Sequence, residues 1–345
     1  MQVRFFCNGS PVAAEDVYRE CVAACMTVND RGALEPRGDR QGTKRFFSHF
    51  VVCVGECSYD FAHLYWEERG SEGYVAKYST GTPSTSVVLK LSIRTNPQCA
   101  EASSIEGVVP CASLLLGRVQ VMACARTDGF RLHDVLARHW HKGESRKVVS
   151  YYAQIGVFLA ATCSRLMKAG VVPCDIKPEN ILVQSIKDGL LKLWLGDIDG
   201  MVTPGSRRKA VTATFMMSRA SVFDSTLDAA TCVFALCLTM LEYTNNMCRC
   251  TADKILLNPH AWWKQPASHP FSMEHPVVAM LLKERPCGLL ATLRAPFVCA
   301  ILRLANCGPA LHDAAVVIKL LDDVHESFQA HTEGSVLAEL AKSAM

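Results

Sequence analysis

The sequence predicts an α+β protein of two lobes, a small β-rich one over residues 58–125 and a larger helical one over residues 126–345. Short β-like runs separated by turn clusters fill the first of these segments, which is the pattern of strands. Beyond residue 128 the apolar residues mostly recur at helical spacing. Residues 1–57 fit neither pattern and are taken as an N-terminal extension. A ligand cleft is expected between two such lobes.

Individual elements follow from the local patterns in chain order. The extension is expected to hold one helix over residues 13–25 and then a polar, glycine-rich loop over residues 29–45. In the small lobe a helical segment over residues 98–106 interrupts the β-like runs, which are FAHLYW, YVAKYS, SVVLKLSI and VQVMACA. The helices expected in the large lobe are DVLARHW, VVSYYAQIGVFLAATCSRLM, the run from Ala229 to Tyr243, and AAVVIKLLDDVHESF.

Composition limits the classes of protein that fit this chain. Half of the 345 residues are apolar and a fifth are charged, which allows a sizeable core and excludes global disorder. The net charge of +3 is too balanced to favour nucleic acid or a membrane as a partner, so neither is expected. The 17 cysteines are odd in number and have no framework spacing. They predict a reduced intracellular protein of the cytoplasm or nucleus.

The strongest local signal is the segment VVPCDIKPENILV, residues 171–183. It follows a long amphipathic helix and precedes two β-like runs, ILVQ and LKLWLG. It resembles the catalytic loop of protein kinases, in which an Asp is followed two residues later by Lys and five residues later by Asn. A chance match of Asp, Lys, Pro and Asn at these offsets has a probability on the order of 10⁻³. The chain is therefore similar to the protein kinase superfamily, in a divergent form, over about three-quarters of its length.

The resemblance implies a bilobal protein-kinase-like fold and transfer of the γ-phosphate of Mg-ATP to Ser or Thr of protein substrates. Asp175 would orient the attacking hydroxyl. Lys177 would neutralise charge that develops on the transferred phosphoryl group. A Lys at that offset resembles the Ser/Thr-directed kinases more than the tyrosine-directed ones. Asn180 would supply an oxygen ligand to Mg²⁺.

A second metal ligand is expected in the segment LGDIDG, residues 195–200, which ends a β-like run. The segment resembles the Asp-Phe-Gly motif of the family. In the favoured register Asp197 binds the metal and Ile198 takes the place of the Phe. The alternative register uses Asp199 and Gly200 and leaves Asp197 inside the strand.

The segment from Gly70 to Val75 resembles the last part of the family's glycine-rich phosphate loop, although Glu68 stands where the first Gly is expected. Gly70 and Gly73 would let backbone N–H groups approach the phosphates closely, and Val75 would also contact the nucleotide. A rival segment that begins at Gly55 keeps only the first Gly and is less favoured.

The strand VVLK resembles the one that carries the ATP-anchoring lysine, here Lys90. A lysine among Val and Leu buries its stem and favours a charged partner. Glu101 on the following helix is the candidate partner, with Glu106 as an alternative, and Lys77 is a less favoured anchor.

The run VQVMACA resembles the strand that leads to the hinge between the kinase lobes. The resemblance then implies that Met122 lines the back of the adenine pocket. The backbone of Ala123 and Cys124 would hydrogen-bond the purine edge.

Two segments depart from the family pattern. Pro173 and Cys174 stand where kinases have His and Arg, which argues against switching by phosphorylation of the activation segment. Residues 217–219 read Met-Ser-Arg in place of Ala-Pro-Glu. The reacting positions are all present, so an active enzyme is favoured over a pseudokinase or a small-molecule phosphotransferase. This divergence is similar to that of kinases of large DNA viruses such as herpesviruses, for which the compartment would be the host cell.

Overall fold

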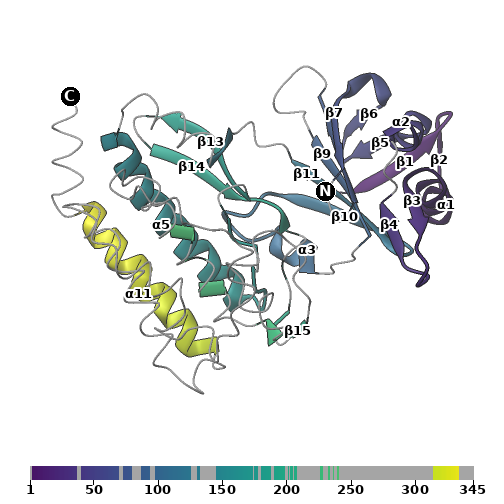
Figure 1. Cartoon of the computed structure of the whole chain (residues 1–345). Helices are drawn as coiled ribbons and strands as arrows, with labels where there is room; N and C mark the ends of the chain where they lie inside the picture. The colour runs from purple at the N-terminus through teal and green to yellow at the C-terminus, as the bar shows by residue number, and fades with distance from the viewer. Residues whose placement is uncertain are drawn as a thin grey trace, which may run out of the picture. The chain divides into compact units, whose positions relative to one another are not determined.

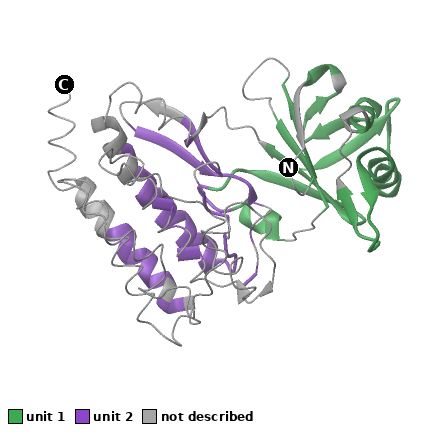
Figure 2. Ribbon diagram, viewed as in Figure 1, with its two compact units in different colours: residues 1–104, 108–128 green, residues 105–107, 129–345 purple. Residues whose placement is uncertain are grey.

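The structure is a computed structural model (Figure 1). It describes residues 2–36, 40–69, 73–79, 87–93, 98–125, 130–132, 145–173, 175–177, 180–187, 190–198 and 314–333, with short pieces between residues 201 and 240. The protein is a mixed α/β protein with several small antiparallel sheets. It divides into two compact units, unit 1 with residues 1–104 and 108–128, and unit 2 with residues 105–107 and 129–345 (Figure 2).

Unit 1 contains a five-stranded antiparallel sheet of strand order β10-β11-β9-β8-β7. Its strands are β7 (Leu64–Arg69), β8 (Gly73–Tyr78), β9 (Val87–Ser92), β10 (Cys111–Leu116) and β11 (Val119–Ala125). A short 3-10 helix, η1 (Phe61–His63), precedes β7, and helix α3 (Gln98–Ala102) lies between β9 and β10 in the chain. The expected strands in YVAKYS, SVVLKLSI and VQVMACA are confirmed. Strand β10 was not expected, and α3 ends four residues before the predicted end at residue 106.

The N-terminal residues form their own secondary structure within unit 1. Four strands pair in the order β2-β1-β5-β6, and a separate hairpin pairs β3 with β4. The elements are β1 (Val3–Cys7), β2 (Ser10–Pro11), α1 (Ala14–Cys25), β3 (Met26–Val28), β4 (Leu34–Pro36), α2 (Arg40–His49), β5 (Val51–Val54) and β6 (Cys57–Tyr59). Helix α1 begins one residue after the predicted start and ends where predicted.

One hydrophobic core joins the N-terminal residues to the five-stranded sheet. The sheet contributes buried side chains, such as Tyr74 and Ala76 on β8 and Leu89 on β9, where buried positions largely alternate. The N-terminal residues contribute Val17 and Cys21 of α1 to the same cluster. Because a strand has a side-chain period of two, these sheet residues share one face. Residues 1–57 therefore cover one face of the sheet.

The loop expected over residues 29–45 is wrong, because β4 and most of α2 lie within it. Helix α2 is polar over most of its length, but Phe46 and Phe47 near its end are fully buried. The ring of Phe46 lies 5.3 Å from that of Phe50 and 6.3 Å from that of Phe5 on β1, measured between centroids. Burial of these aromatic rings stabilises a helix that its polar composition alone does not favour.

Unit 2 contains two long helices and a small sheet of strand order β12-β13-β14 (Figure 1). Its elements are β12 (Phe130–Arg131), α5 (Ser145–Lys168), β13 (Ile181–Lys187), β14 (Leu190–Leu195), β15 (Ser206–Arg207), β16 (Thr226–Leu227) and α11 (Ala314–Glu333). Helices α5 and α11 lie side by side. The Asp322 carboxylate accepts hydrogen bonds from Ser164 Oγ at 2.6 Å and Lys168 Nζ at 3.0 Å. This contact ties the two helices together.

The remaining sequence expectations for unit 2 are met in part. Helices α5 and α11 lie where helices were predicted. Within the predicted helix from Ala229 to Tyr243, the described residues are helical and fully buried, namely Cys232, Val233, Leu236, Thr239 and Met240. The helix expected in DVLARHW lies outside the described residues. Over the described part of the chain, no helix is long and apolar enough to cross a membrane, and the cysteines there are free thiols.

Candidate active site

The loop that leads to the site begins at a tight turn that ends α5. The amide of Gly170 donates to the carbonyl of Met167 at 3.0 Å, and that of Val171 donates to Leu166 at 2.9 Å. These two bonds and the positive φ of Gly170, 77°, form a Schellman motif, in which glycine adopts the left-handed conformation without a steric penalty. The turn sends Val171 and Val172 directly into the core. The start of the loop is thereby fixed.

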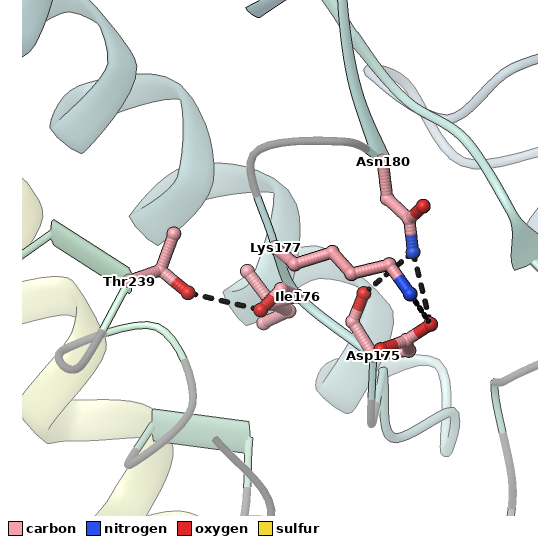
Figure 3. A network of polar contacts seen from close by, with 5 residues as sticks. All are labelled: Asp175, Ile176, Lys177, Asn180 and Thr239. Carbon is pink, nitrogen blue, oxygen red and sulfur yellow. Dashed lines mark hydrogen bonds and ion pairs between the residues drawn. The ribbon is translucent and has the colours of Figure 1, made fainter. Parts of the chain in front are cut away.

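At the centre of the loop, three predicted residues lie within hydrogen-bond distance of one another (Figure 3). Lys177 Nζ lies 2.7 Å from Asp175 Oδ2, and both side chains are mostly buried, 17% and 8% exposed respectively. The Asn180 amide nitrogen donates to the carbonyl oxygen of Asp175 at 2.9 Å and to its Oδ2 at 3.1 Å. Charge-assisted bonds of this kind are stronger than neutral ones, so the Asp175 carboxylate is held in one orientation.

The loop is also held from below by a residue much later in the chain. Thr239 Oγ1 donates to the carbonyl oxygen of Ile176 at 2.9 Å, and both residues are fully buried (Figure 3). A buried carbonyl without a donor would cost free energy. Thr239 therefore fixes the backbone between Asp175 and Lys177. Sequence analysis did not single out Thr239, and the one available signal was a hydroxyl within the most apolar run of the chain.

The two predicted metal ligands lie at the same end of the β13–β14 hairpin. Ile181, the first residue of β13, pairs with Leu195, the last residue of β14. Asn180 and Asp197 flank this pair, and the amide of Gly196 donates to the carbonyl of Asn180 at 2.7 Å. The sequence places both oxygen-bearing side chains at this end because the strands are antiparallel.

The structure bears on the register of the LGDIDG segment. Strand β14 ends at Leu195, so Asp197 does not lie inside the strand as the alternative register requires. Asp197 is exposed and has a positive φ of 54°, whereas Ile198 is 2% exposed. The favoured register places an apolar residue at that buried position. Asp199 and Gly200 lie outside the described residues.

In unit 1, three predicted nucleotide-contacting residues form one row across the five-stranded sheet. Lys90 on β9 pairs with Val75 on β8 and with Met122 on β11. Directly opposite residues point to the same face, which here is the face opposite to Leu89 and Leu91. Val75 and Lys90 are half-buried, and Met122 is fully buried with its sulfur 3.6 Å from the Cys99 sulfur. The row places a cation beside two apolar side chains.

The hinge residues continue along β11 beyond Met122. Ala123 is fully buried and Cys124 is half-buried. The Ala123 side chain lies in the core on the other face of the sheet, so only its backbone is left to meet a ligand on the Lys90 face. Their contact with a purine stays a prediction.

The candidate partners of Lys90 differ in their surroundings. Glu101 is exposed on α3, whereas its neighbours Cys99 and Ala102 are buried. Glu106 Oε2 lies 3.7 Å from an Arg165 guanidinium nitrogen, so the alternative partner already has a cationic neighbour. The pairing of Lys90 with Glu101 stays a prediction.

The glycines have different local roles. Gly73 opens β8 and is buried, and a Cβ there would overlap the carbonyl oxygen of Leu91. Gly55 of the rival segment has a φ of 61° in the turn between β5 and β6, and a tight hairpin turn explains that glycine without a phosphate. Gly70 lies outside the described residues. Lys77, the less favoured anchor, is half-buried on β8 and pairs with Val88.

The donor set at the hairpin end fits a nucleotide-bound Mg²⁺. The amide nitrogen of Asn180 is committed to Asp175, which turns its amide oxygen away from that carboxylate (Figure 3). Within the described residues no group of three or more His, Cys, Asp or Glu side chains could hold a metal by itself. Mg²⁺ in phosphoryl-transfer sites uses one or two protein oxygens together with phosphate and water. Asn180 and Asp197 would meet that requirement.

The departures from the kinase pattern are only partly visible. Pro173 is buried immediately before the loop, and Cys174 and residues 217–219 lie outside the described residues. No protein-family model matches this chain, and a search of curated proteins finds no significant match. The case for a function therefore rests on the residues and their geometry.

Proposed function

We propose that this chain is a protein kinase that transfers the γ-phosphoryl group of Mg-ATP to Ser or Thr hydroxyls of protein substrates. The observation that carries the proposal is the Asp175 carboxylate, held by Lys177 at 2.7 Å and by Asn180 at 3.1 Å in the loop between α5 and β13. Phosphoryl transfer depends mainly on positioning and electrostatics, and this arrangement supplies both around one carboxylate.

Each residue of the loop has a distinct task in the proposed reaction. Asp175 accepts a hydrogen bond from the acceptor hydroxyl and takes its proton, while the new P–O bond to that hydroxyl oxygen forms and the bond from the γ-phosphorus to the leaving ADP oxygen breaks. Lys177 keeps that carboxylate oriented and places a positive charge where the transferred phosphoryl oxygens pass. Asn180 and Asp197 would hold Mg²⁺, which when bound screens the charge of the phosphates.

The order of features along unit 1 supports the same function. In protein kinases a glycine-rich loop covers the phosphates, the lysine that binds them lies on the third strand, and its glutamate partner lies on the next helix. Here a hairpin with Gly73 precedes the third strand of the five-stranded sheet, β9, which carries Lys90. The next helix is α3, which carries Glu101. These features therefore follow one another along this chain in the same order as in protein kinases.

A second candidate is a nucleotide-binding pseudokinase without turnover. The exposure of Glu101 on a helix of five residues favours it, because the lysine–glutamate ion pair must be in place for transfer. A small-molecule phosphotransferase is less favoured, since such enzymes usually lack a lysine at the position of Lys177.

The decisive experiment measures phosphate transfer from labelled Mg-ATP to the protein itself and to generic Ser/Thr substrates. Wild type is compared with Asp175→Asn, which keeps the side-chain shape, and with Lys90→Met and Lys77→Met. We expect transfer by wild type and Lys77→Met and none by the other two variants. Loss in Lys77→Met with retention in Lys90→Met would move the anchor to Lys77. Binding of Mg-ATP without transfer by folded wild type would favour the pseudokinase.

A further inference from the structure

One polar contact links the N-terminal residues to the strand that follows the glycine segment. The hydroxyl of Tyr74 on β8 donates to the carbonyl oxygen of Cys25 at 3.0 Å, and both residues are buried. Cys25 is the last residue of α1, so its carbonyl has no partner within the helix. A buried carbonyl and a buried hydroxyl would each be costly without a partner. The contact therefore satisfies both groups at once.

Tyr74 stands at a sensitive place in the proposed nucleotide site. It lies between Gly73, which opens β8, and Val75, which pairs with Lys90. Its own side chain points into the core that the sheet shares with α1, so it does not face the side of the sheet where Lys90 lies. Any effect of Tyr74 on a nucleotide must pass through the backbone of β8.

The acceptor side of the contact is itself fixed by close packing. A Cβ on Gly42 of α2 would overlap the carbonyl oxygen of Ala24, the residue before Cys25. The amide of Met26, the residue after Cys25, donates to the carbonyl of Val22. The end of α1 is thus held on one side by α2 and on the other by its own last turn.

We propose that Tyr74 is a positioning residue, which anchors the start of β8 to the end of α1 and so holds the backbone of Gly73 and Val75 in place for the nucleotide. This inference rests on the proposed function for its ligand, although the anchor itself does not. Residues 1–57 then serve nucleotide binding from the face of the sheet opposite to the nucleotide.

The test compares Tyr74→Phe with Tyr78→Phe in the full chain. Both changes remove one phenolic oxygen from the same face of β8, but Tyr78 lies at the far end of the strand. The first measurement is amide hydrogen exchange of residues 73–78 without nucleotide. The second is the dissociation constant of Mg-ADP by calorimetry, at a temperature where each variant is fully folded.

We expect faster exchange at the start of β8 in Tyr74→Phe and a dissociation constant for Mg-ADP roughly three- to tenfold higher than in wild type. Tyr78→Phe should bind Mg-ADP as wild type does. Unchanged exchange in Tyr74→Phe, or equal losses of affinity in both variants, would overturn the positioning role. Faster exchange in Tyr74→Phe while wild type binds no Mg-ADP would support the anchor and reject the proposed function instead.

Discussion

Asn180 donates its side-chain amide to two oxygens of Asp175, the backbone carbonyl at 2.9 Å and Oδ2 at 3.1 Å. One side chain thus fixes both the path of the loop and the orientation of the carboxylate. The amide oxygen of Asn180 points away from Asp175 (Figure 3). The orientation of the Asp175 carboxylate and the proposed metal site therefore depend on the same side-chain amide.

Replacing Asn180 should separate these two roles. Asn180→Asp keeps an oxygen for Mg²⁺ but loses the donor and places a carboxylate oxygen where the amide nitrogen now lies, 3.1 Å from Asp175 Oδ2. Asn180→Ala loses the donor and the ligand. We expect both variants to lower kcat by about 100-fold or more, and only Asn180→Ala to need much higher Mg²⁺ for half-maximal rate. Rates measured across a Mg²⁺ titration check this, and a wild-type rate for Asn180→Ala at saturating Mg²⁺ would contradict it.

Thr239 should matter for stability through one hydrogen bond. Thr239→Val keeps the side-chain shape but leaves the buried carbonyl of Ile176 without its donor, which should lower the free energy of unfolding by about 1–3 kcal/mol. Thr239→Ser keeps the hydroxyl and is the matched control. Urea unfolding reports the difference. Equal midpoints for Thr239→Val and wild type would show that the bond does not hold the loop.

Gly170 should resist substitution because of its backbone conformation alone. Its φ is 77°, and nothing lies within 4 Å of where a Cβ would stand. Gly170→Ala should therefore destabilise the protein by about 1 kcal/mol through left-handed strain, whereas Gly170→Asn should cost less because Asn tolerates that region. Thermal unfolding of the two variants measures the difference, and a larger loss for Asn than for Ala would argue for a steric cause.

The contact between α5 and α11 should make the stability of the fold depend on pH. Burial raises the pKa of Asp322, but hydrogen bonds from Ser164 and Lys168 and the charges of Lys168 and His325 outweigh it and lower the pKa below its ordinary 3.8. The ionised carboxylate then stabilises the fold above that value, and the contribution is lost as the pH falls through the folded pKa. The gap in melting temperature between wild type and Asp322→Asn should shrink below about pH 4. A gap of constant size down to pH 2.5 would contradict this.

The sequence predicted some elements closely and missed others for a physical reason. Helix α1 was found to within one residue because its buried residues recur every three to four positions. Strand β11 was found because it is a short and almost wholly apolar run. Helix α2 was missed because its polar residues dominate the local pattern, while Phe46 packs against Phe5 of β1 and Phe47 against Tyr78 of β8. A local sequence pattern reflects one segment only, so it holds no information about side chains that pack against that segment from elsewhere in the chain.

The candidate site likewise contains residues that a short motif singles out and contacts that no short motif indicates. Asp175, Lys177 and Asn180 lie within one stretch of six residues, and the resemblance of that short segment to a catalytic loop was enough to single out all three. The Thr239 contact spans 63 residues, and the contact between Tyr74 and Cys25 spans 49. No short motif encodes either contact, because each depends on how distant elements pack.

The core shared by the N-terminal residues and the five-stranded sheet limits where this chain can be truncated. The motifs place the start of the kinase-like part near residue 58. That position separates the N-terminal residues from the five-stranded sheet, although both contribute side chains to one apolar cluster. A chain that begins there would present Tyr74, Ala76, Leu89 and Leu91 to water across one continuous patch. Patches of that kind drive proteins to associate. A truncated chain should therefore be recovered as aggregates, and every assay of this protein should use a chain that includes the first strand, β1.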